Sequence, residues 1–102
     1  MNRAPRAGSS PEAWTRYERA RTAIMIGSAV RSARKAAGMT QARLATLCST
    51  SQPAIARLEK GLVAPTVVSL DRIARALGTE LVIDFEPLGT LGGARTDAQA
   101  RP

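Results

Sequence analysis

Polar side chains that could read another molecule gather between Gly38 and Gly61, in the run GMTQARLATLCSTSQPAIARLEKG. Gln52 stands near the start of one predicted helix, and its side-chain amide can pair with N6 and N7 of adenine. Arg57, farther along that helix, could hold O6 and N7 of guanine or a phosphate. Gln41 stands at the start of the preceding predicted helix, where unsatisfied backbone N–H groups favour a phosphate. These residue types at this spacing indicate recognition of a DNA duplex by a helix-turn-helix.

Other residues of the same run are expected at that surface. Pro53 can pack on a thymine methyl group, and Ala56 is small enough to let its helix approach a groove. Arg43 and Lys60 flank the run as phosphate contacts, although solvation explains them equally well. Ser51 is expected to cap the second helix. Two alternatives stay open. Gln41 and Gln52 could face water near the helix caps, and Arg57 could pair with an acidic residue on the surface.

The charge of the chain is strongly basic. Its 102 residues hold 15 Lys and Arg against 8 Asp and Glu, with no His, for a net charge of +7. No acidic residue lies between Glu18 and Glu59, the interval that contains most of the motif. This coincidence favours a phosphate-facing surface, although an arginine-rich solubilising face would have the same composition.

The composition argues against several classes of protein. Cys48 is the single cysteine and is expected in the core, so the sequence predicts no intrachain disulfide, no protein metal site and no cofactor. With no His and no clustered carboxylates, acid–base catalysis has no evident residues, and the chain is not expected to be an enzyme. No apolar run suits a membrane span or a signal peptide, so we expect a cytoplasmic protein that joins the bacterial nucleoid when bound to DNA.

Capping residues and periodicity predict mainly helices. Helix starts are expected at Ser10-Pro11, Thr40, Ser51 and Pro65-Thr66. Gly27 interrupts the first helical stretch, which is therefore one kinked helix or two. Residues 80–86 change to strict alternation, which predicts a strand with Leu81, Ile83 and Phe85 on one face.

A lone strand needs a partner from another molecule, because its backbone N–H and C=O groups are otherwise unpaired. We expect antiparallel pairing with the same strand of a second copy, with a different protein as the alternative. Trp14 and Tyr17 could meet Phe85 in space and cover that strand as a dimer or partner interface. The alternative is that the three aromatic residues extend the core of one chain.

Residues 26–78 resemble the Xre family of Cro- and phage-repressor-type helix-turn-helix proteins. The resemblance rests on Arg34, Gly38-Met39-Thr40-Gln41, Leu44-Ala45, Ser51-Gln52, Ile55, Arg57-Leu58-Glu59, Gly61, Pro65, Leu70, Ile73-Ala74 and Leu77-Gly78. It implies a phosphate contact by Gln41 and an internal ion pair between Arg34 and Glu59. The sequence departs from the family at Ser49, where Gly is usual, and at Pro53, where a polar base-reading residue is common.

The resemblance implies a predominantly all-α fold, a lambda-repressor-like bundle of about five helices with one C-terminal strand. The expected organisation is a disordered arm (1–9), a helical extension (10–25), the DNA-binding domain (26–78), a dimerisation strand (79–87) and a disordered tail (88–102). Residues 12–87 also resemble the small HigA-type antitoxins.

Two functions follow as hypotheses. The first is a dimeric, sequence-specific transcriptional regulator of its own operon that binds double-stranded DNA through residues 51–60. The second is an antitoxin that also neutralises a cognate RelE/HigB-like toxin. A module that binds only proteins, with a degenerate helix-turn-helix, is disfavoured because Gln52 and Arg57 are both present.

Overall fold

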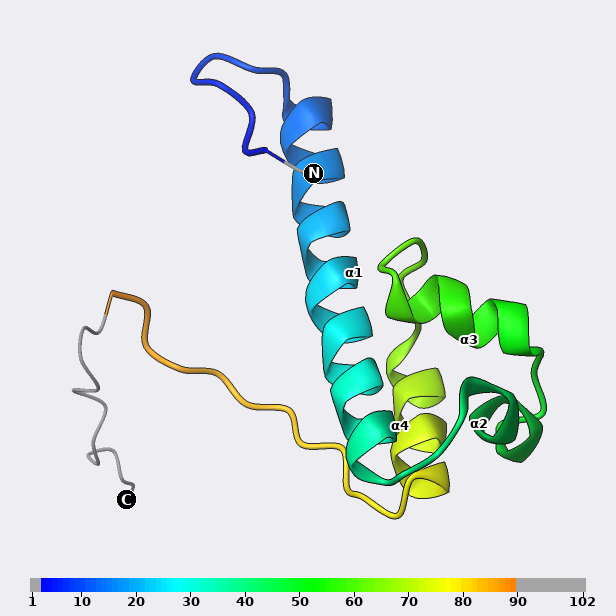
Figure 1. Ribbon diagram of the computed structural model, residues 1–102. Coiled ribbons are helices and arrows are strands. Elements are labelled where there is room, and N and C mark those ends of the chain that lie inside the picture. Colours follow the sequence, from blue (N-terminus) through cyan, green and yellow to red (C-terminus); the bar gives the residue numbers. More distant parts are fainter. Residues whose placement is uncertain (1–2, 90–102) are drawn as a thin grey trace.

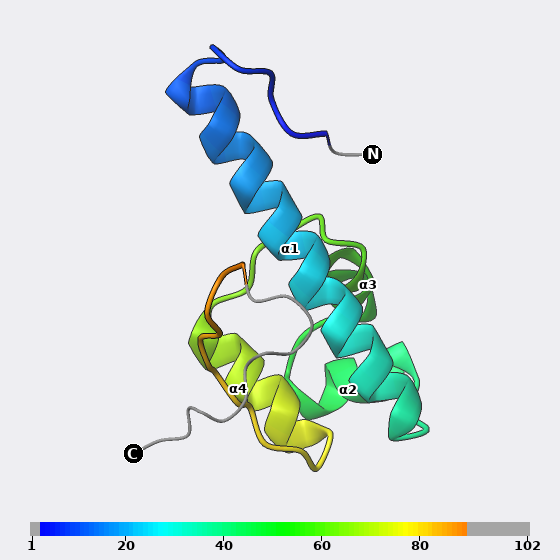
Figure 2. The same ribbon diagram turned by 90° about the vertical axis from the view of Figure 1, so that its left-hand side faces the viewer.

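The computed structural model describes residues 3–89 and contains four α-helices in that range. These are α1 (Pro11–Ala36), α2 (Gln41–Leu47), α3 (Gln52–Glu59) and α4 (Val67–Ala76). The three shorter helices pack beside the second half of α1, while the first half of α1 extends beyond them (Figures 1 and 2). The bundle is therefore predominantly helical, as the sequence predicts, with one long helix that only partly belongs to it.

Each helix begins at a side chain that caps it. The hydroxyl oxygens of Ser10, Thr40, Ser51 and Thr66 each accept a hydrogen bond from the backbone N–H three residues later. Such caps satisfy N–H groups that have no partner within the helix, and each contributes about 1 kcal/mol. All four starts match the predicted ones, because capping depends on residues within one turn.

Ser49 adopts a left-handed conformation, with φ of 55°. It follows the end of α2, where the N–H of Thr50 donates to the carbonyl of Ala45 at 2.9 Å. This geometry usually requires Gly, so Ser49 costs about 1 kcal/mol at this turn. This left-handed residue lies where the chain reverses direction between α2 and α3.

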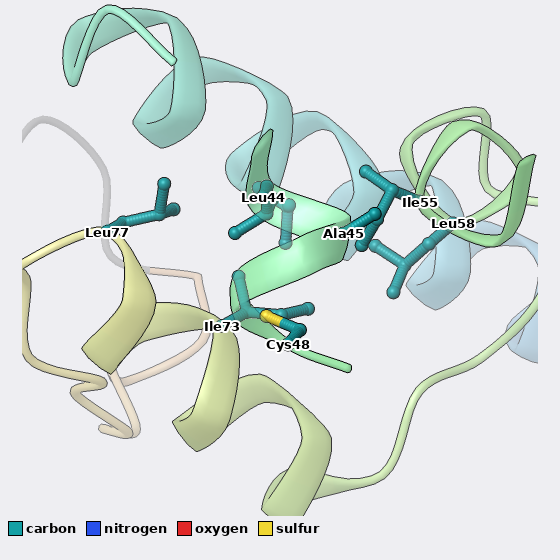
Figure 3. Packing of buried hydrophobic residues seen from close by; sticks show 8 residues of the cluster. Leu44, Ala45, Cys48, Ile55, Leu58, Ile73 and Leu77 are labelled. Atoms are coloured by element: carbon teal, nitrogen blue, oxygen red, sulfur yellow. The ribbon is translucent and has the colours of Figure 1, made fainter. Parts of the chain in front are cut away.

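The core lies where α2, α3 and α4 meet the second half of α1 (Figure 3). Leu44 and Ile55 are its most completely buried large side chains. Its members are Val30, Leu44, Ala45, Cys48, Ile55, Leu58, Ile73 and Leu77. This core fixes the position of α3, whose outer side then remains free.

The expectation of about five helices is wrong by one, because Gly27 neither kinks nor breaks the first helix. α1 runs without interruption through Gly27. A Cβ atom at this position would lie 2.3 Å from the carbonyl oxygen of Leu58 and 2.8 Å from that of Glu59. Glycine is needed here for the close approach of α1 to the end of α3, and not for flexibility of the helix.

The predicted strand is not formed within the single chain. Residues 80–86 lie outside any helix or strand, and the side chains of Ile83 and Phe85 are 65% and 92% exposed. No second strand exists in residues 3–89 to complete a ladder, so the backbone of this segment has no sheet to join. Any pairing of the segment requires another molecule.

The terminal regions are only partly described. Residues 3–9 of the predicted arm contain no helix or strand. Residues 1–2 and 90–102, which include most of the predicted tail, lie outside the described part of the chain. No helix within residues 3–89 is long and apolar enough to cross a membrane.

The close approach at Gly27 yields a first prediction. Gly27→Ala should lower the free energy of unfolding by at least about 2 kcal/mol, because the methyl group would collide with backbone oxygens that cannot move aside. Urea unfolding followed by circular dichroism measures this change. Ser28→Ala, at the neighbouring exposed position of α1, is the matched control and should stay within about 0.5 kcal/mol of the parent. Equal stability of both variants would contradict the observed packing of α1 on α3.

Candidate nucleic-acid interface

The outer side of α3 carries most of the residues predicted to read DNA. Ile55, Leu58 and Glu59 point into the bundle and are buried. Five other residues, of α3 and its C-cap, share the opposite side of the helix, because they recur at intervals of three to four residues. They are Gln52, Pro53, Arg57 and Lys60, all exposed, with Ala56 half-buried among them. The structure thus brings these residues together on one accessible surface.

Gln52 is joined to Gln41 by a side-chain hydrogen bond. Its Nε2 donates to Oε1 of Gln41 at 2.6 Å. The bond connects the first residue of α3 with the first residue of α2. It occupies one N–H of the Gln52 amide and leaves its oxygen and its second N–H available to a ligand.

A buried ion pair lies behind the two glutamines. Arg34 Nε donates to Glu59 Oε2 at 2.6 Å, and Arg34 Nη2 donates to Glu59 Oε1 at 3.0 Å. The two side chains are only 10% and 2% exposed. The arginine also donates from Nη1 to the carbonyl of Met39 at 2.7 Å, so it binds the link between α1 and α2 as well.

The ion pair and the glutamines form one continuous network. Gln41 Nε2 donates to Glu59 Oε1 at 3.0 Å while Gln41 Oε1 accepts from Gln52. The order of contacts is therefore Arg34, Glu59, Gln41, Gln52, which runs from the core to the exposed face of α3. Sequence reasoning treated the pair and the glutamines separately and missed this connection. The only available signal was that both glutamines occupy the first position of a helix.

The network determines the charge state of Glu59. Burial alone raises the pKa of a carboxyl group, but the hydrogen bonds from Arg34 and Gln41 favour the ionised form more strongly. The net result is that the pKa of Glu59 is held below its ordinary value. The hydrogen bond to Glu59 likewise raises the pKa of Arg34, so the pair is fully ionised at neutral pH.

The cations around this face are available to an anion. Arg43, in the first turn of α2, is exposed, as are Arg57 and Lys60. None of the three takes part in the ion pairs found within residues 3–89. The alternative that Arg57 pairs with a surface acid therefore finds no support in this structure.

The three aromatic residues are not brought together within one chain. The rings of Trp14 and Tyr17 meet edge to face on the first half of α1, with centroids 6.0 Å apart. Phe85 is 92% exposed and lies on the segment that leaves the bundle after α4. The alternative that all three extend the core of the monomer is therefore wrong for Phe85.

Cys48 is a core residue, as predicted. Its side chain is buried, and burial raises the pKa of its thiol despite the nearby Arg72 guanidinium. A protonated, buried thiol is a poor nucleophile and a poor metal ligand. Within the described residues, no group of three or more potential metal-binding side chains occurs.

Comparison with known proteins agrees with this geometry. The family model described as helix-turn-helix matches residues 30–83, just over half of the chain. An uncharacterized HTH-type transcriptional regulator from Methanothermobacter thermautotrophicus is 42% identical over 56 residues, which make up 55% of this chain and 81% of that protein. The crystal structure of the clp gene regulator ClgR from C. glutamicum superposes with a TM-score of 0.54 at 31% identity, covering 60% of this chain and 77% of that one. Both proteins are named as regulators and not as enzymes.

The network yields a second prediction, on stability and pH. Glu59→Gln should lower the free energy of unfolding at pH 7 by about 3–5 kcal/mol, because it leaves the buried Arg34 without a counter-charge. The pKa of Glu59 is lower in the folded than in the unfolded chain, so its stabilisation is present above the ordinary value of 4.5 and is lost as pH falls further. The difference between parent and variant should therefore shrink below about pH 4.5.

Denaturant unfolding at several pH values measures this difference. The matched control is Asp71→Asn, which removes the exposed ion pair of Asp71 with Arg75 on α4. That variant should cost less than about 1 kcal/mol, because exposed pairs are screened by solvent. Similar losses in the two variants would show that the Arg34–Glu59 pair is not the stronger constraint.

Proposed function

Because the chain belongs to the Xre/Cro-type helix-turn-helix family of transcriptional regulators, we propose that it represses transcription by occupying a specific operator as a dimer. The observation that carries the proposal is the exposed face of α3, on which the amide of Gln52 is already held by Gln41. Orienting a base-reading side chain before binding reduces the entropy lost on complex formation.

Each residue of this face has a role in the proposal. The oxygen and remaining N–H of the Gln52 amide pair with adenine N7 and N6 in the major groove. Arg57 pairs with a guanine or a phosphate, Pro53 packs on a thymine methyl group, and Ala56 leaves room for the groove wall. Ser51 caps the helix through its hydroxyl and keeps its start rigid.

The surrounding cations supply contacts to the DNA backbone. Arg43 and Lys60 flank the reading face and neutralise phosphates without regard to sequence. Gln41 keeps one amide N–H for a phosphate while its other polar atoms hold Glu59 and Gln52. Its proposed role is therefore positioning first and phosphate contact second.

The proposed dimer forms through the C-terminal segment, residues 80–86. This segment pairs antiparallel with its counterpart in a second copy and buries the half-buried Leu81 together with Ile83 and Phe85, which are exposed in the single chain. A twofold dimer would present two α3 helices to successive major grooves about 34 Å apart, on an inverted repeat. Occlusion of RNA polymerase at its own operon is the proposed mode of repression.

The first half of α1 favours an antitoxin as the second candidate function. This part of the helix extends beyond the bundle (Figure 1). It exposes Trp14, whose ring meets that of Tyr17, and Ile24 and Met25 follow at the middle of α1 with exposed side chains. Exposed apolar and aromatic side chains of this kind mark protein-binding surfaces. A neighbouring gene for a small basic RelE/HigB-like protein that copurifies with this chain would support the candidate, and copurification unaffected by Trp14→Ala would contradict this surface.

The third prediction separates base reading from phosphate binding. Gln52→Ala should weaken binding to the preferred duplex by about 1–3 kcal/mol, relax the preference at one base position and leave binding to scrambled duplex nearly unchanged. Arg43→Ala should weaken binding to all sequences about equally and reduce the dependence of log K on log salt by about one. Fluorescence anisotropy with both duplexes at several salt concentrations measures these effects. Equal losses by Gln52→Ala on both duplexes would contradict its role as a base reader.

A further inference from the structure

A shallow groove of about 210 Å³ runs between the first half of α1 and the loop that joins α3 to α4. We call it the α1 groove. Its floor is apolar and its α1 edge is basic, with Arg16, Arg19, Ala20, Ala23, Leu62 and Val63 among its lining residues. Leu62 and Val63 are 63% and 36% exposed. Both side chains therefore keep part of their apolar surface exposed within residues 3–89, and neighbouring exposed apolar side chains of this kind mark interaction sites.

The α1 groove is held open by the backbone. Gly61 has φ of 76°, and a Cβ atom there would lie 2.7 Å from a side-chain carbon of Ile24. The loop therefore approaches α1 closely at Gly61, while Leu62 and Val63 turn outward from that contact. A groove fixed by such close backbone packing is formed before any ligand binds.

The C-terminal segment has the opposite character. Residues 80–86 contain three acids, Glu80, Asp84 and Glu86, and no Lys or Arg, in a chain of net charge +7. Between these acids stand Leu81, Val82, Ile83 and Phe85, the last three exposed in the single chain. An acidic, apolar extended segment thus accompanies a basic, apolar groove in the same sequence.

We propose that the C-terminal segment of a second copy of this chain lies in the α1 groove. Leu81, Ile83 and Phe85 face the floor of the groove. Glu80 and Asp84 alternate with them on the outer face of the segment, where the long side chains of Arg16 and Arg19 reach them around its edge. The inference rests on the proposed dimer and deepens it, but it is independent of DNA binding. Two such contacts, exchanged around a twofold axis, cover both grooves and both segments.

The dimensions of the two partners agree. Four residue steps of extended chain, from Leu81 to Phe85, span about 13 Å. The face of α1 from Arg16 to Ala23 rises about 10 Å along the helix axis. The apolar side chains of the segment are therefore far enough apart to contact the whole α1 side of the groove.

A second copy must supply the segment, because the C-terminal segment of each chain lies outside the α1 groove of the same chain. After α4 it runs away from the bundle, with Ile83 and Phe85 exposed (Figures 1 and 2). Trp14, Tyr17 and Arg21 follow the helical spacing of the other side of α1, so their face stays free for another partner.

Charge reversal tests the proposal in solution without DNA. Arg16→Glu with Arg19→Glu should weaken self-association by at least about tenfold, measured by sedimentation equilibrium, because like charges would then face each other. Adding Glu80→Arg and Asp84→Arg should restore most of the loss. The matched control is Arg6→Glu with Arg21→Glu, which changes the net charge equally outside the groove and should have little effect. The proposal would be overturned if the Arg16→Glu, Arg19→Glu variant self-associated as tightly as the control. It would also be overturned if the fourfold variant did not regain self-association.

Cross-linking locates the segment. In a Cys48→Ala background, one copy carries Ala20→Cys and a second, differently tagged copy carries Ile83→Cys. Mixing them with a short bismaleimide should yield a covalent heterodimer. Cross-links only between two Ile83→Cys copies would leave the paired dimer intact but overturn its place in the groove. A third sample is a single chain that carries both Ala20→Cys and Ile83→Cys. A cross-link within that chain, together with no covalent heterodimer in the mixture, would also overturn the proposal. So would a parent chain that stays monomeric at high concentration. DNA binding is measured separately, and its loss or presence tests the proposed function independently of the α1 groove.

Discussion

The buried ion pair between Arg34 and Glu59 is the constraint on which the rest of the structure depends. Both charges are removed from water, so each requires the other, and the loss of one partner costs about 3–5 kcal/mol. The pair joins the end of α1 to the end of α3, and its arginine also binds the carbonyl of Met39. Glu59 then holds Gln41, and Gln41 holds Gln52. A charge pair in the core thereby sets the orientation of a side chain on the surface.

α1 serves two purposes along its length. Its second half supplies Val30 and Arg34 to the bundle, and Gly27 lets the backbone of α3 approach it closely. Its first half has the α1 groove on one side and the Trp14–Tyr17 ring pair on the other. A single continuous helix therefore connects the bundle that carries the proposed DNA-reading face to the surfaces proposed for protein partners.

Local chemistry made much of this fold predictable. Caps such as Ser51 and Thr66 depend on a few neighbouring residues, and the sequence indicated both of them correctly. Gly27 was ambiguous, because its function is a contact with residues 31 and 32 positions away in the sequence. The hydrogen bond from Gln52 to Gln41 was missed for the same reason, since it requires two helices to be placed in space. The alternation of residues 80–86 predicted a strand that the single chain does not form, because a strand needs a partner and residues 3–89 contain none.

The outer face of α3 is proposed to read a specific DNA sequence. This proposal is tested most directly by titrating the full chain against the duplex upstream of its own gene, with a scrambled duplex of equal length, at two salt concentrations. The account predicts tight binding to the upstream duplex that persists at the higher salt, while binding to the scrambled duplex is lost. Weak binding to both duplexes that disappears equally with salt would contradict it, because the basic surface would then attract DNA only by charge.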